Sequence, residues 1–216
     1  MNRRLHPTVK RILSLAVSFW VCSVPGQESP FLPQTLGLEA APKLPAPSES
    51  PAPLFTNWNV GLVLGAGFGV STMGSMKAHD LTAATLHIGR LLRSEKPFFR
   101  NVEIAGELWG GAQYRPEVAY VVGLTPVVRY HFLRRSRWTP FLDGGAGITA
   151  TDIGRPDLST TFQFNLQGGA GFHWALCRNL AFTFQARCIH ISNAGIEMPN
   201  EGVNSFLFSG GLTRCF

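Results

Sequence analysis

Two residues near the C-terminus combine a base with a nucleophile. His190 and Ser192 lie two positions apart, at the end of a segment with the alternation of a β-strand. Successive side chains of a strand point to opposite faces, so the imidazole and the hydroxyl would share one face. A histidine beside a serine hydroxyl can remove its proton and make it a nucleophile toward an acyl carbon. The pair therefore predicts a hydrolase.

A set of strands must hold this pair, and the sequence from residue 57 onward supplies them. It divides into about eight segments of roughly ten to fifteen residues, separated by turn-like clusters. Most segments carry apolar side chains at even-numbered positions. The clearest one sets an apolar row against a polar row: Phe162, Phe164, Leu166, Ala170, Phe172 and Trp174 against Thr161, Gln163, Asn165, Gln167 and His173. This pattern predicts an all-β fold, an eight-stranded antiparallel transmembrane β-barrel.

The polar rows collect charged and titratable side chains of both signs. They are Glu103, Glu107, Arg129, His131, Asp143, His173 and Arg187. In a narrow barrel these groups would face the lumen and pair with one another, whereas in a soluble sandwich they would form a solvated outer surface. We favour the lumen, because a closed barrel is the form of sheet that spans lipid without unpaired edges. Aromatic residues near the strand ends also resemble the interfacial girdles of membrane barrels.

Two segments precede the barrel, which we place at residues 56–216. Residues 1–26 join four basic residues to an apolar run and then to small residues, and predict a cleaved signal peptide. Residues 27–55 are rich in proline, alanine, serine and glutamate and predict a periplasmic tether. The formal net charge of +6 falls to +2 when the four basic residues of the leader are removed. The mature chain is too weakly basic to predict nucleic-acid binding.

Topology then assigns the connections to the two sides of the membrane. With both termini in the periplasm, residues 92–98, 133–137 and 176–179 would form inner turns, and residues 71–79, 115–117, 152–160 and 193–202 would form outer loops. His190 and Ser192 would then lie at the extracellular end of the seventh strand, on the lipid-facing side, and Asn204 would share that face. Packing gives no reason for polar side chains there. The alternative is that they lie at the level of the lipid headgroups.

The C-terminal residues also resemble a known family. The segment from His190 to Gly195, followed by Pro199-Asn200 and Gly202, is similar to the C-terminal signature of the outer-membrane lipid A 3-O-deacylases. Residues 138–147 look like the fifth strand of that family. The resemblance implies a barrel in the outer membrane of a Gram-negative bacterium, with its site facing the membrane. It also implies that lipid A, in lipopolysaccharide, is the substrate and loses an ester-linked 3-hydroxyacyl chain.

The resemblance assigns roles to individual residues as well. Ser192 matches the nucleophile of the family, and His190 matches its base. Asn193 matches the asparagine that stabilises the oxyanion. The resemblance thus implies that this chain transfers an acyl group through a serine.

One position departs from the family. Its best-known members orient the histidine with a glutamate at the start of the last strand, where this sequence has Asn204. An amide oxygen can still hold the correct tautomer of an imidazole, as in Cys-His-Asn proteases. Glu197 and Glu201 in the preceding loop are alternative acids, but the expected register favours Asn204.

Other functions stay open at this point. The main alternative is a non-catalytic barrel that stabilises the outer membrane or binds an external partner, and the missing carboxylate at position 204 supports it. A small-solute channel is disfavoured, because side chains fill the lumen of an eight-stranded barrel. The sequence is also compatible with a homodimer. We predict no cofactor and no metal, since Cys177, Cys188 and Cys215 lack the spacing of metal ligands.

Overall fold

The computed structural model describes residue 55 and residues 57–72, 77–134 and 137–216. The predicted signal peptide, residues 1–26, and the predicted tether, residues 27–55, lie outside this described part except for Phe55, and both remain predictions. Phe55 is buried, and its ring stacks on the imidazole of His131 with centroids 4.7 Å apart. Because His131 faces the barrel interior, Phe55 packs inside one end of the lumen.

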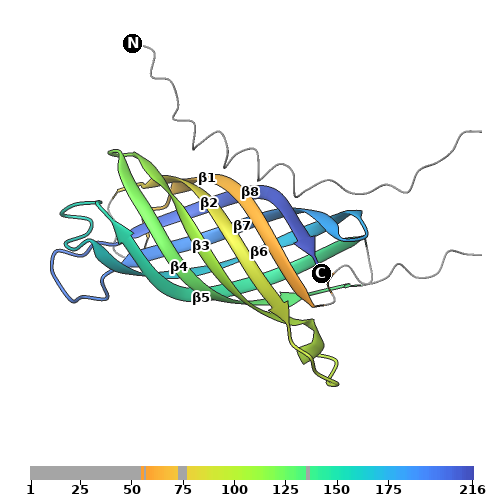
Figure 1. The fold of residues 1–216 in the computed structure, drawn as a ribbon. Helices are drawn as coiled ribbons and strands as arrows, with labels where there is room; N and C mark the ends of the chain where they lie inside the picture. The colour runs from red at the N-terminus through yellow and green to blue at the C-terminus, as the bar shows by residue number, and fades with distance from the viewer. Residues whose placement is uncertain (1–54, 56, 73–76, 135–136) are drawn as a thin grey trace, which may run out of the picture. The chain divides into compact units, whose positions relative to one another are not determined.

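Eight antiparallel strands form a closed barrel in the order of the sequence (Figure 1). They are β1 (Trp58–Gly69), β2 (Asp80–Leu91), β3 (Val102–Arg115), β4 (Ala119–His131), β5 (Trp138–Thr151), β6 (Phe162–Cys177), β7 (Leu180–Ser192) and β8 (Val203–Cys215). A short 3-10 helix, η1 (Phe99–Asn101), lies between β2 and β3. Within the described ranges, no helix is long and apolar enough to cross a bilayer. The predicted eight-stranded antiparallel barrel is confirmed.

The strands alternate between a buried and an exposed face, as the sequence predicts. In β2 every second side chain is buried and those between are exposed along almost the whole strand. Leu64, Leu108 and Leu124 on three different strands are each more than half exposed, at 63%, 53% and 51%. A belt of apolar side chains of this kind is the surface that a barrel presents to lipid.

Exposed aromatic side chains form two bands, one near each end of the barrel. The band at the end that holds the C-terminus contains Trp58, Phe98, Phe132, Trp138 and Trp174, and the other contains Phe68, Tyr114, Tyr120, Phe162 and Phe164. Amphipathic aromatic rings are favoured at the two interfaces of a membrane. The bands therefore agree with the girdles expected from the sequence.

Charged side chains in the lumen pair across the barrel. The Arg187 guanidinium bonds the carboxylates of Glu107 and Asp143, with an Nη2–Oδ2 distance of 2.6 Å to Asp143. The Arg129 guanidinium donates to the same Asp143 oxygen at 2.8 Å. All four side chains are almost completely removed from solvent. Burial of these charges is tolerated because each one has a partner of opposite sign.

Histidines extend this network toward the end that holds the C-terminus. Glu103 is hydrogen-bonded by His87 Nε2 at 2.6 Å and by His131 Nε2 at 2.5 Å. His87 was not singled out from the sequence, although its odd number places it in the polar row. His173 also faces the lumen, but its Nδ1 is hydrogen-bonded to Thr183 Oγ1 at 2.8 Å and not to a carboxylate. The predicted charge-paired lumen is present, with His87 added and His173 bonded to a hydroxyl.

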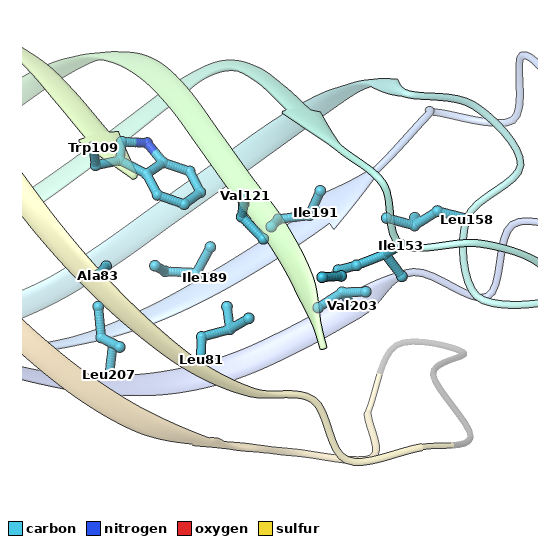
Figure 2. Packing of buried hydrophobic residues seen from close by; sticks show 11 residues of the cluster. Leu81, Ala83, Trp109, Val121, Ile153, Leu158, Ile189, Ile191, Val203 and Leu207 are labelled. Atoms are coloured by element: carbon cyan, nitrogen blue, oxygen red, sulfur yellow. The ribbon is translucent and has the colours of Figure 1, made fainter. Parts of the chain in front are cut away.

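The other half of the lumen contains an apolar cluster, with buried polar side chains such as His79, Gln113 and Asn165 at the same end. Figure 2 shows side chains from several strands, among them Trp109, Val121 and Ile191, directed toward one another inside the barrel. Ile153 and Leu158, from the connection between β5 and β6, join the same buried cluster. Side chains thus fill the interior at this level, as expected for a barrel of eight strands.

Candidate active site

The predicted pair sits at the end of β7, between two strands that register places beside it. Ser192 lies opposite Phe164 of β6, and His190 lies opposite Leu166. On the other side, His190 lies opposite Asn204 at the start of β8. All of these residues are even-numbered and belong to the outward row. The structure therefore brings His190, Ser192 and Asn204 together on the outer wall.

Hydrogen bonds connect the three side chains in one chain. His190 Nδ1 lies 2.7 Å from Asn204 Oδ1, and His190 Nε2 lies 3.1 Å from Ser192 Oγ. An amide oxygen only accepts, so Nδ1 must carry the hydrogen that it donates to Asn204. In the neutral imidazole Nε2 is then left as the acceptor of the Ser192 hydroxyl. This tautomer is the one in which the imidazole can take a proton from the serine.

The orientation of the Asn204 amide is fixed by a second contact. Its Nδ2 donates to the backbone carbonyl of Thr72 at 2.6 Å. The Asn204 backbone carbonyl also accepts from the backbone N–H of Val70 at 3.0 Å. Asn204 is 5% exposed, so both ends of its amide are used inside the structure. The residue links the connection between β1 and β2 to the imidazole.

The alternative acids lie elsewhere in the loop between β7 and β8. Glu197 forms an ion pair with Arg155, with an Oε1–Nη2 distance of 2.6 Å, and both side chains are exposed. Glu201 is half-buried ahead of β8. The ring nitrogen that such an acid would bind is already bonded by Asn204.

Asn193 shapes the loop that follows Ser192. Its side chain is buried, with Nδ2 donating to the Glu197 carbonyl at 2.7 Å and Oδ1 accepting from the Gly195 N–H at 2.9 Å. These bonds enclose a turn in which Ala194 and Gly195 have positive φ angles of 55° and 80°. The amide has two hydrogens, and the bond to the Glu197 carbonyl uses one of them.

Asn200 and Thr72 belong to the site but received no role from the sequence. The Asn200 side-chain oxygen accepts from the Asn193 backbone N–H at 3.2 Å, directly after Ser192. Asn200 did appear in the signature motif, which was the signal that could have identified it. Thr72 contributes a backbone carbonyl, and no side-chain pattern reveals such a contact.

The connection between β5 and β6 supports the loop of the site. The Gly202 N–H donates to the Asp157 carbonyl at 3.1 Å, and the Ser159 hydroxyl bonds the Pro199 carbonyl. Together with the Arg155–Glu197 pair, these contacts join two loops at the same end of the barrel. In the part of the chain that the structure describes, no group of three or more His, Cys, Asp or Glu side chains is arranged to hold a metal ion.

Apolar side chains surround the polar trio on the outer wall. Phe164 and Leu166 of β6 are exposed beside it, and Phe206 of β8 stacks on Phe68 with centroids 6.0 Å apart. Ser192 is half-buried and lies in an apolar wall of the kind that a hydrocarbon chain can contact. Chemically, the arrangement supports acyl transfer at the lipid boundary.

Comparison with known proteins identifies a family for this chain. Residues 93–213 match the family described as lipid A 3-O-deacylase (PagL), which is more than half of the chain. The chain belongs to the lipid A 3-O-deacylase family. The matched residues run from before β3 into the last part of β8 and include the polar trio.

An individual relative is similar in sequence, and a solved structure is similar in fold. The chain is 33% identical over 88 residues to the lipid A deacylase PagL of Pseudomonas aeruginosa, covering 39% of this chain and 48% of that protein. The alignment thus spans about half the length of this relative. The crystal structure of the outer membrane enzyme PagL superposes with a TM-score of 0.51 at 19% identity, covering 71% of this chain and 99% of PagL.

A second solved barrel is similar in fold. Neisserial surface protein A superposes with a TM-score of 0.55 at 15% identity, and the match covers 74% of this chain and 98% of the Neisserial chain. Family membership and the apolar outer wall place this deacylase-family protein in the outer membrane of a Gram-negative bacterium, as predicted.

Proposed function

We propose that this protein is an outer-membrane serine esterase that removes an ester-linked 3-hydroxyacyl chain from lipid A. The observation that carries the proposal is the hydrogen-bonded chain from Ser192 through His190 to Asn204, in the outward row of β7 and β8. Family membership supports the substrate class. The proposal gives a reason for polar side chains at outward positions where lipid contact would favour apolar ones.

The reaction proceeds in two acyl transfers. His190 Nε2 takes the proton of Ser192 while Oγ attacks the carbonyl carbon of the ester. The tetrahedral intermediate collapses, the bond from carbon to the sugar oxygen breaks, and His190 returns the proton to that oxygen. Water, deprotonated by His190, then attacks the acyl carbon of the acyl-serine. The bond from this carbon to Oγ breaks, His190 returns the proton to Ser192 Oγ, and a free 3-hydroxy fatty acid is released. Asn204 accepts from Nδ1–H in both steps and keeps Nε2 directed at the reacting atoms.

Asn193 is the proposed donor to the oxyanion. It follows Ser192 directly, and its second amide hydrogen is not required by the bond to Glu197. A donor placed at the developing negative charge contributes about 3 kcal/mol to the stability of the transition state. The turn with Ala194 and Gly195 holds the residue in place for this role.

The direct test removes the nucleophile. Expression of the protein in a Gram-negative host is expected to remove one hydroxyacyl chain from its lipid A, as seen by mass spectrometry. Ser192→Ala is expected to abolish that change while the barrel remains folded. Ser209→Ala is the matched control, because Ser209 is buried on the inner face of β8. Continued loss of the acyl chain in the Ser192→Ala variant would contradict the proposal.

A non-catalytic barrel is the second candidate, and the amide at position 204 is the observation that favours it. A carboxylate stabilises an imidazolium better than an amide does, so Asn204 predicts slower turnover than a glutamate would give. An assay with a short-chain p-nitrophenyl ester in detergent separates the two candidates. Turnover that depends on Ser192 supports the esterase, and its absence supports the structural role.

A further inference from the structure

A hollow in the outer wall lies at the opposite end of the barrel from Ser192. It has a volume of about 440 Å³ and is lined by residues of β1, β2 and β3. Trp58, Ile88 and Ile104 provide apolar walls. At its floor, a Cβ atom on Gly106 would meet nothing within 4 Å. The space is therefore wide enough for part of a hydrocarbon chain.

Two arginines border this apolar hollow. Arg90 lies across from Trp58 and Ile104 in the sheet, and its guanidinium stacks over the Trp58 ring at 5.2 Å. Arg93 follows at the start of the turn. Among the described residues, neither arginine forms an ion pair with an acid. A guanidinium held by an aromatic face keeps its N–H groups available for an anion.

The surrounding turn is basic. Between β2 and β3 it carries Arg93, Lys96 and Arg100 against the single acid Glu95. This end of the barrel also holds the C-terminus, where the Phe216 N–H bonds the Trp58 carbonyl at 2.8 Å. With the termini in the periplasm, as the predicted signal peptide implies, the hollow lies at the level of the phospholipid headgroups of the inner leaflet.

We propose that this hollow is a binding site for an anionic phospholipid of the inner leaflet. An acyl chain would lie over Gly106 between Ile88 and Ile104, and the phosphate would accept from Arg90 and Arg93. The combination of an apolar hollow with two unpaired arginines matches a ligand that joins a hydrocarbon chain to a phosphate. The site is separate from the Ser192 chemistry and does not depend on it.

The test measures lipid binding to the full chain purified in detergent micelles, by native mass spectrometry. Phosphatidylglycerol is the probe. Two comparison ligands each lack one part of it: diacylglycerol with the same acyl chains lacks the phosphate, and inorganic phosphate lacks the acyl chains. We expect phosphatidylglycerol to bind more tightly than either. Arg90→Gln combined with Arg93→Gln should weaken its binding by about 25-fold, roughly fivefold for each arginine.

Two matched controls separate the hollow from general attraction to the membrane surface. Arg137→Gln combined with Arg178→Gln removes the same charge from turns at the same end of the barrel, and should leave binding unchanged. Gly106→Leu fills the hollow and should weaken phosphatidylglycerol binding with both arginines intact. Gly110→Leu, on the same strand and also outward-facing but outside the hollow, should not. Circular dichroism confirms that each variant retains its strands.

Each remaining outcome overturns the proposal. Equal binding of diacylglycerol would show that the arginines do not hold the phosphate. Displacement of the lipid by inorganic phosphate at equal concentration would show an ion site only. An equal loss in the control pair of arginines, or unchanged binding by Gly106→Leu, would show that lipid does not occupy the hollow.

Discussion

At the scale of single residues, Asn204 does two things that a carboxylate cannot do together. Its oxygen accepts from His190 Nδ1, and its nitrogen donates to the Thr72 carbonyl. A glutamate or aspartate could replace the first bond, but an ionised carboxylate has no hydrogen for the second. The amide at this position is thus matched to a backbone carbonyl that the connection between β1 and β2 places beside the site.

Truncation of this residue tests its role in orienting the imidazole. Asn204→Ala removes the acceptor of Nδ1–H, so His190 loses its fixed tautomer, and we expect kcat to fall by about 10²-fold. Asn204→Asp keeps an acceptor of the same length and should retain more activity than the alanine variant. The measurement is the rate of ester cleavage in detergent, with KM determined separately. An alanine variant as active as the wild type would exclude Asn204 from catalysis.

Asn193 provides the second test at this scale. If its amide stabilises the oxyanion, Asn193→Ala should lower kcat by about 10²- to 10³-fold with little change in KM. If the residue only shapes the loop, the same variant should instead lower the unfolding temperature and raise KM. Steady-state kinetics and a thermal melt on the same sample distinguish the two results.

At the scale of the elements, the register between β7 and its neighbours determines which way the site faces. Side chains alternate with a period of two, so a slip of one residue would turn His190 and Ser192 into the lumen. The pairing of His190 with Asn204 and with Leu166 prevents this. The loop that leads from Ser192 back to β8 must then return without displacing the imidazole.

Gly202 lies where that return passes close to the imidazole. Its φ angle is +78°, and a Cβ atom there would lie 3.1 Å from His190 Cε1. Gly202→Ala should therefore displace the imidazole and lower kcat while the barrel stays folded. Gly195→Ala is the matched control, since Gly195 has a φ angle of +80° with nothing within 4 Å of its added Cβ. Equal losses in the two variants would show that backbone strain alone is responsible.

At the scale of the whole molecule, the barrel reverses the usual arrangement of a soluble protein. Apolar side chains such as Leu64 and Leu108 face outward, and the ion pairs of Glu107, Arg187 and Asp143 are enclosed. Stability in lipid then depends on the pairing of buried charges, because an unpaired one cannot reach water.

Removal of one partner from the lumen network tests this dependence. Arg187→Met leaves Glu107 without its main counter-charge and should lower the free energy of unfolding by about 3–5 kcal/mol. The double change Glu107→Gln with Arg187→Met removes both charges and should recover part of that loss. Urea unfolding of the barrel refolded into lipid vesicles measures both variants. A single variant as stable as the double one would show that leaving the Glu107 charge unpaired costs no stability.

The sequence by itself determined the number of strands, their faces and the outward position of His190, Ser192 and Asn204. Those properties follow from a period of two within each segment, which is local and needs no knowledge of neighbouring strands. It also predicted that the lumen would hold Glu103, Glu107, Arg129 and Arg187, because their odd numbers place them in one row.

Only the tertiary structure decided which of these groups meet. The bond from Asn204 to the Thr72 carbonyl joins residues 132 positions apart. The bond from Asn193 Nδ2 to the Glu197 carbonyl forms only because the path of the loop brings that carbonyl to the Asn193 side chain. Phe55 was predicted to belong to the tether, yet it packs against His131 inside the barrel. Such contacts depend on closure of the sheet and on the paths of loops, which bring backbone groups together that no side-chain pattern encodes.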